Sequence, residues 1–155
     1  MFFDMGQLAA DIRYKILTAT VTPRPIAWVT TRSADGVVNA APFSFFNVLG
    51  HEPPTVALGL LRHPEKGLKD TAENILATGE FVAHLVPRGM ADAMNATCVD
   101  APREVDELAL AGLRTVPWPR SPSEGGADAD PRGETAAALP ARADVRSRGR
   151  GRSLP

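Results

Sequence analysis

Residues 39–47 read Asn-Ala-Ala-Pro-Phe-Ser-Phe-Phe-Asn and place small and polar side chains within an apolar strand pattern. Ala41 leaves room for a planar group close to the backbone, while Asn39 and Ser44 offer hydrogen bonds at the edge of such a plane. The stretch is therefore compatible with a slot for a flat heterocycle. An ordinary core strand with a proline near its start explains the same pattern.

Arg24 is the first candidate for binding a phosphate. It lies between Pro23 and Pro25, which hold the backbone extended and exclude a helix there. A planar guanidinium group can donate to two phosphate oxygens at once. A solvated loop arginine is the alternative interpretation.

Lys69 is the second candidate, because it comes just before the start of a predicted helix that runs to about Thr78 and is stopped by Gly79. Lys69 and Thr71 would lie at the helix N-terminus, where the dipole and unpaired N–H groups stabilise an anion. We expect Asp70 or Thr71 to cap this helix. Simple capping beside a solvated lysine is the alternative.

Apolar periodicity predicts the elements that would position these residues. Residues 8–17 are expected to form an amphipathic helix, and residues 26–31 and 37–47 a strand pair around a turn at 33–36. Residues 55–61 are almost entirely apolar, which predicts a strand buried on both faces. The remaining predictions are a strand at 80–86, helices at 88–96 and 104–111, and the start of a strand at 113–118.

The sequence carries no recognisable catalytic constellation. Ser44 is not in a nucleophile-elbow pattern, and neither a P-loop nor a Gly-x-Gly-x-x-Gly motif is present. The three histidines stand on separate segments without metal-ligand spacing, so we predict no metal. The single cysteine, Cys98, fits a reducing compartment, and no apolar run is long enough to span a bilayer. A soluble cytoplasmic protein is expected.

The chain changes character after residue 118. Residues 119–155 are rich in Arg, Ala, Pro and Gly, contain no Lys and include few large apolar residues, which predicts a disordered tail behind a domain over residues 1–118. A shifted reading frame would produce such a composition, and a genuine disordered extension is the alternative. With a net charge of −1 and one short Arg-Gly run, no specific nucleic-acid partner is expected.

Five segments, taken together in order and separation, resemble the flavin reductase-like family of FMN-binding split β-barrels, which includes flavoredoxin-type proteins. The segments are Tyr-Lys-Ile-Leu at 14–17, Pro-Arg-Pro-Ile-Ala-Trp-Val at 23–29, the stretch at 39–47, Lys-Asp-Thr at 69–71 and Glu-Phe-Val at 80–82. Two departures are that His84 stands where relatives commonly have Asn, and that the family barrel normally continues with further strands beyond Trp118.

The resemblance implies a mainly β fold with helical insertions, a Greek-key split β-barrel that would be incomplete at the C-terminus. It also implies a homodimer, with FMN as cofactor and NAD(P)H as a transient co-substrate. The implied cofactor-binding residues, with no catalytic residue among them, are Arg24, Lys69 and Thr71 around the phosphate and ribityl chain and Asn39, Ala41, Ser44 and Phe45 along the flavin.

The implied function is hydride transfer from NAD(P)H to flavin, which needs no acid or base from the protein. Two alternatives remain open. One is an FMN carrier or electron-transfer protein that does not itself oxidise NAD(P)H, and the other is an inactive truncated product.

Overall fold

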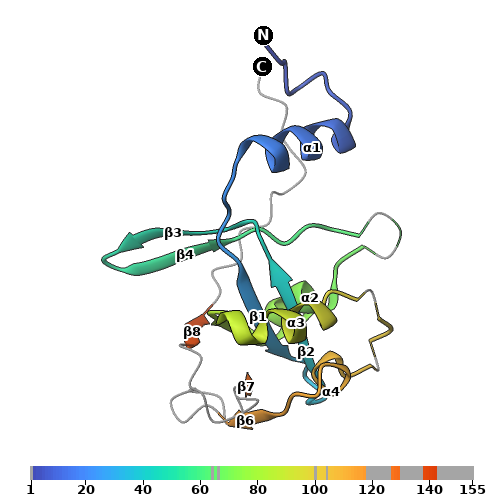
Figure 1. The fold of residues 1–155 in the computed structure, drawn as a ribbon, viewed down its shortest axis with the longest axis vertical. Helices are drawn as coiled ribbons and strands as arrows, with labels where there is room; N and C mark the ends of the chain where they lie inside the picture. Colours follow the sequence, from blue (N-terminus) through green and yellow to red (C-terminus); the bar gives the residue numbers. More distant parts are fainter. Residues whose placement is uncertain are drawn as a thin grey trace.

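The structure is a computed structural model of the 155-residue chain. It describes residues 2–63, 65, 67–99, 101–103 and 105–114, together with the backbone of 115–117, 127–129 and 138–142. Figure 1 shows a body built around one sheet, with a helix and a hairpin projecting from it. No helix among the described residues is long and apolar enough to cross a membrane.

The central sheet has four antiparallel strands in the order β2 (Val38–Phe43), β1 (Ala27–Arg32), β5 (Glu80–His84) and β8 (Ala138–Arg142). The turn between β1 and β2 places Gly36 at a φ of 87°, a left-handed conformation that suits glycine. Ser33 Oγ accepts a hydrogen bond from the Val37 N–H within this turn. The predicted hairpin is therefore confirmed.

Strand β1 is buried on both faces because it lies inside the sheet and is covered above and below. On one face Trp28 packs with Ala40, Met90, Leu108 and Leu113. On the other face Val29 joins a second cluster, whose buried members are Ala27, Ile75, Phe81 and Ala83. These two clusters hold the sheet and its helices together.

Helix α2 (Asp70–Thr78) covers the second face and is fixed to the sheet by two buried side-chain hydrogen bonds. Asn39 Nδ2 donates to Thr71 Oγ1 at 2.8 Å, and Asn74 Nδ2 donates to Thr31 Oγ1 at 3.0 Å. The helix ends at Gly79, whose φ is 74°. The predicted helix and its glycine stop are confirmed, but the N-cap is Lys69 rather than Asp70 or Thr71.

Short elements cover the Trp28 face. They are the 3-10 turn η1 (Arg88–Met90), α3 (Ala91–Ala96), α4 (Glu107–Leu110) and β6 (Thr115–Pro117). Asp106 caps α4, because its side chain accepts from the N–H groups of Leu108 and Ala109. The helical segment predicted at 88–96 is present as η1 followed by α3, and the helix predicted at 104–111 is present but shorter.

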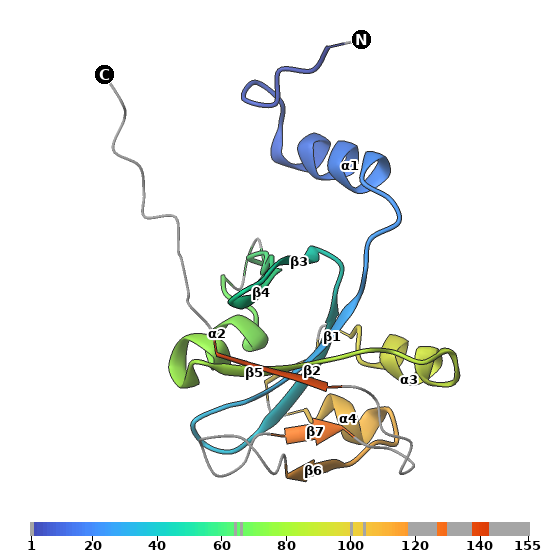
Figure 2. The same ribbon diagram turned by 90° about the vertical axis from the view of Figure 1, so that its left-hand side faces the viewer.

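Helix α1 (Ala10–Thr20) lies away from the sheet, and the hairpin of β3 (Phe46–His51) and β4 (Pro54–Leu58) packs only its base, through Phe46, Val56 and Leu58, against the second cluster. Figures 1 and 2 show α1 standing apart at the end of an extended connection. It contains no buried residue. At the hairpin tip, Val48 and Leu49 are 64% and 69% exposed.

Two strand predictions need correction. Residues 39–47 do not form one strand, because the chain leaves β2 after Phe43 and begins β3 at Phe46. The strand predicted at 55–61 is also not buried on both faces. Since β4 pairs only with β3 in a two-stranded sheet, its side chains range from exposed to half-buried.

The segment predicted to be a disordered tail contains two strands. β7 (Ala127–Ala129) pairs with β6, and β8 pairs with β5 along the edge of the central sheet. The structure thus gives these residues strand backbone, and the division of the chain at residue 118 stays a prediction. Backbone pairing does not require the large apolar side chains on which the prediction was based. The rest of 119–155 lies outside the described residues.

Candidate ligand-binding site

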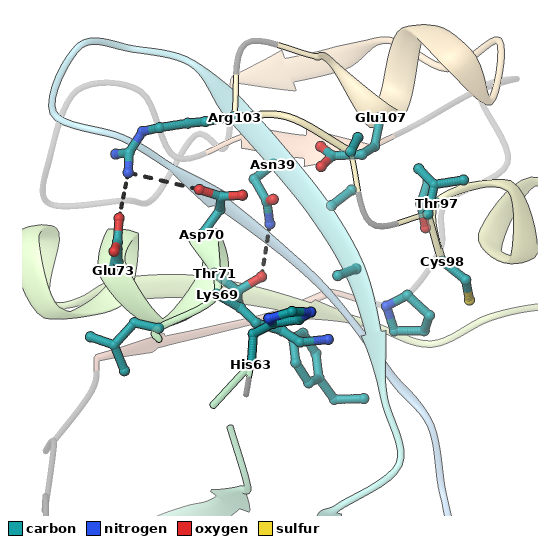
Figure 3. A pocket seen from close by; sticks show the side chains of 17 residues that line it. Asn39, His63, Lys69, Asp70, Thr71, Glu73, Thr97, Cys98, Arg103 and Glu107 are labelled. Carbon is teal, nitrogen blue, oxygen red and sulfur yellow. Dashed lines mark hydrogen bonds and ion pairs between the residues drawn. The ribbon is translucent and has the colours of Figure 1, made fainter. Parts of the chain in front are cut away.

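A cavity of about 450 Å³ opens between β2, the start of α2 and the segment from Thr97 to Glu107. This size lies within the range of small-molecule sites. One wall is β2, where the lining residues Ala40 and Ala41 have short side chains and Ala40 is fully buried. Figure 3 shows polar side chains surrounding the opening.

The N-terminus of α2 forms a second wall. Lys69 occupies the N-cap position and makes no side-chain capping hydrogen bond. The N–H groups of Asp70 and Thr71 belong to the first turn, which has no intrahelical acceptors for them. Both residues line the cavity together with Lys69. Backbone donors, the helix dipole and one ammonium group thus meet at this wall, an arrangement that suits an anion.

The carboxylates of Asp70 and Glu73, in the first turn of α2, would repel an anion at this wall. Arg103 offsets part of their negative charge. Arg103 lies 3.7 Å from Asp70 Oδ1 and also pairs with Glu73. Figure 3 shows its guanidinium group between the two carboxylates. Arg103 therefore neutralises part of the negative charge beside Lys69 and connects the segment before α4 to α2.

Glu107 brings a third carboxyl group to the cavity, from the first position of α4. The residue is 7% exposed, and its Oε2 has no hydrogen-bond partner among the described residues. Burial raises the pKa of Glu107, and the negative charges of Asp70 and Asp106 raise it further. Hydrogen bonds from the backbone of Glu107 and Ala40 act in the opposite direction.

Four of the seven predicted site residues line this cavity, namely Asn39, Ala41, Lys69 and Thr71. Asn39 and Thr71 are buried and bond to each other, so one part of their role is to hold α2 against β2. Lys69 has no ion pair with the described residues. Its ammonium group is therefore available for a ligand.

Arg24, Ser44 and Phe45 do not line the cavity and instead form a junction between α1 and the strands. Arg24 donates to the carbonyl oxygens of Thr18 and Val21 at 2.6 and 2.9 Å, and to Ser44 Oγ at 3.3 Å. Phe45 makes an edge contact with Tyr14, with ring centroids 6.0 Å apart. The predicted flavin contacts of these three residues stay predictions.

Phe45 also explains a glycine in the loop after β4. A Cβ built on Gly59 would lie 2.8 Å from Phe45 Cβ, too close for any side chain. The Gly59 N–H donates to the Phe45 carbonyl at 2.7 Å. Gly59 thus fixes the chain path at the junction.

His84 is the last residue of β5, and its side chain is buried in the core rather than lining the cavity. It is 1% exposed, its Nε2 is 2.9 Å from Thr30 Oγ1, and its ring contacts Trp28 edge-on. Burial lowers the pKa of His84 to about 4, so the ring is neutral at pH 7. Across the described residues, no group of three metal-ligating side chains is found.

Sequence reasoning missed Glu107 and Arg103. Both occur in a segment read only as helix and loop, and their positions depend on long-range packing against β2 and α2. The capping aspartate before Glu107 was the available signal, since it marks where the helix starts. Nothing local indicated that the start would face a cavity.

The sheet, its projecting hairpin and the cavity make up a small, mainly β domain. A family model described as "Flavin reductase like domain" matches residues 19–141. The chain therefore belongs to this family, which associates it with flavin chemistry at a general level. The predicted family resemblance is confirmed, and the match extends past residue 118.

The chain is also similar to curated proteins over about three quarters of its length. An uncharacterized protein of Halalkalibacterium halodurans is 49% identical over 117 residues, which cover 76% of this chain and 56% of that protein. The chain spans about half the length of the curated relatives it matches.

Two solved structures establish the fold. Nitrilotriacetate monooxygenase component B from Bacillus cereus superposes with a TM-score of 0.80 at 27% identity, covering 94% of this chain and 68% of that one. A protein with a split barrel domain from Shewanella frigidimarina gives 0.69 at 18% identity, covering 92% and 68%. The predicted split β-barrel fold is confirmed.

Proposed function

We propose that this chain is an FMN-binding flavin oxidoreductase that uses NAD(P)H as the source of hydride. The observation that carries the proposal is the cavity between Ala40–Ala41 and the uncapped start of α2 at Lys69. It combines small side chains along a strand with a helix N-terminus that suits an anion. Membership of the flavin reductase like domain family supports flavin as the ligand.

The residues present fit such a cofactor. Lys69 and the first backbone amides of α2 would hold the phosphate, while Ala41 and its neighbours on β2 would leave space for the rest of the molecule. Bound flavin would supply the two-electron redox chemistry. The role of the chain is then to bind and orient, which agrees with the lack of a predicted catalytic residue.

A two-stage experiment tests this function. Equilibrium dialysis of the purified protein against FMN is expected to show retention of flavin. Anaerobic addition of NADH or NADPH should then bleach the flavin absorbance faster than in buffer. Retention without faster bleaching would favour the FMN carrier or electron-transfer alternative. No retention by a folded protein would contradict the proposal and favour the inactive product.

We further propose that the protein works as a homodimer in the cytoplasm. The support for a second copy is the apolar surface of α1 and the β3–β4 hairpin, where Tyr14, Leu17 and Leu49 are exposed. An isolated helix as short as α1 is marginal in water, so a covering surface would stabilise it. A second copy supplies an identical apolar surface and allows a closed, two-fold contact.

Sedimentation equilibrium tests the dimer. The wild-type chain is expected at twice its monomer mass, and Leu17→Glu or Leu49→Glu is expected to shift it to monomer. Leu76→Glu, at an exposed position on α2, serves as the matched control and should leave the mass unchanged. A wild-type monomer at high concentration would exclude the proposed assembly.

A further inference from the structure

The carboxyl group of Glu107 is the feature of the cavity that the proposed function leaves unexplained. Its side chain comes from α4, on the wall opposite the start of α2, and reaches toward β2, where the Ala40 backbone amide bonds to it. Figure 3 shows Glu107 on the far side of the opening from Glu73. The residue is more than nine-tenths buried.

One oxygen of this carboxyl group lacks a partner. Within the described part of the chain, Oε2 accepts no hydrogen bond, although Glu107 lines the cavity. A buried acceptor without a donor is costly, and more so when it is charged. Such a group calls for an explanation, and a donor that comes from outside the chain is one. Arg103 does not serve here, because it pairs with Asp70 and Glu73.

We propose that Glu107 is a specificity-determining residue of the nucleotide site, where its unpartnered oxygen accepts a hydrogen bond from a neutral N–H or O–H donor of the bound ligand. This inference rests on the proposed function and names a contact that the anion-binding wall cannot make. It also predicts the orientation of the ligand in the cavity. Lys69 attracts the phosphate, and the carboxylate of Glu107 repels it.

The ligand that fits has an anionic group at one end and a hydrogen-bond donor at the other. FMN carries two kinds of neutral donor, the imide N–H of the ring and the hydroxyl groups of the ribityl chain. Both present the same chemistry to a carboxylate oxygen. The test therefore removes them one kind at a time.

The experiment measures dissociation constants by equilibrium dialysis for three ligands: FMN, FMN methylated at the imide nitrogen, and an FMN analogue without ribityl hydroxyls. Each is measured with the wild type, Glu107→Gln and Glu107→Ala. Glu52→Ala, at an exposed glutamate in the β3–β4 turn, is the matched control. Thermal unfolding of every variant confirms that it is folded.

The wild type is expected to bind one of the two analogues about tenfold more weakly than FMN. Glu107→Ala should bind FMN about tenfold more weakly and lose that discrimination. Glu107→Gln keeps an acceptor oxygen and should fall between them, while Glu52→Ala should match the wild type. The analogue that loses affinity identifies the donor.

Three results would overturn the inference. If the wild type binds both analogues as tightly as FMN, no donor contact exists, whatever the variants do. If Glu107→Ala binds FMN normally, or keeps full discrimination, Glu107 is not the acceptor. Failure of the folded wild type to bind FMN would overturn both this inference and the proposed function. The first two results would overturn the inference alone.

Discussion

The two ends of β2 differ in how completely one chain buries its side chains. Near Val38, polar groups are buried and hydrogen-bonded, as in the contact between Asn39 and Thr71. Beyond Phe43, the chain enters the β3–β4 hairpin, where Val48 and Leu49 remain exposed. Side chains at the first end are buried and hydrogen-bonded, so they can shape a site. The second end exposes apolar side chains of the kind that mark contact surfaces for other molecules.

A matched pair of isoleucines should give the largest contrast between these regions. Ile75 on α2 is 3% exposed, and Ile12 on α1 is 39% exposed. Ile75→Ala is expected to lower the free energy of unfolding by about 2–5 kcal/mol, because it removes packing in a closed core. Ile12→Ala should cost less than about 1 kcal/mol in dilute protein.

Urea denaturation at low protein concentration measures both values. Equal losses for Ile75→Ala and Ile12→Ala would mean that α1 is as firmly packed in the single chain as α2, and the contrast between the two regions would be wrong.

The buried region should also carry a pH dependence that the exposed region lacks. The pKa of His84 is lowered by burial from 6.5 to about 4, so folding favours the neutral ring. This stabilisation is complete above pH 6.5 and is lost as pH falls from 6.5 toward 4. The loss amounts to about 3 kcal/mol.

Unfolding free energies measured at several pH values test this, with His84→Asn as the variant. The variant should lose the part of the acid sensitivity that belongs to His84. His51→Asn, at an exposed position of β3, should keep the wild-type profile. An unchanged profile in His84→Asn would show that the ring is not held neutral by the core.

A smaller effect should separate two asparagines. Asn39→Ala leaves Thr71 Oγ1 without its buried donor and is expected to cost about 1–3 kcal/mol of stability. Asn47 is exposed, and its side-chain Oδ1 accepts a hydrogen bond from the neighbouring Val48 N–H. Its replacement by alanine should change stability by less than about 0.5 kcal/mol. Chemical denaturation of both variants decides whether the Asn39 contact supports the fold.

The elements of the buried region could be predicted because local and long-range requirements agree there. The β1–β2 hairpin follows from its turn and its apolar strands, and α2 from its periodicity and Gly79. The break after Phe43 could not be predicted, since an apolar run does not show where a chain leaves a sheet. The apolar residues of β4 likewise predicted a strand buried on both faces, whereas its side chains are exposed or half-buried.

The site could be predicted in part for a related reason. Lys69 and Thr71 belong to a helix start, which local sequence reveals. Glu107 reaches the cavity only because α4 packs against β2, a contact between segments more than sixty residues apart. Arg24 donates to Ser44 Oγ, but its guanidinium group is also engaged by the end of α1, a contact that the local sequence does not reveal.

Ser44→Ala tests whether the junction contributes to binding. If the cavity alone forms the site, the dissociation constant for FMN should change by less than about twofold, because Ser44 lies outside it. Loss of affinity comparable to that of a cavity variant would extend the site to the junction and restore the predicted role of Ser44.

The most direct test of the account is equilibrium dialysis of FMN against the wild type, Lys69→Ala and Lys15→Ala. Lys15 is an exposed lysine of α1 and controls for loss of charge. The account predicts FMN retention by the wild type and by Lys15→Ala, and about tenfold weaker retention by Lys69→Ala. Absence of retention by folded wild-type protein, or equal retention by all three, would contradict it.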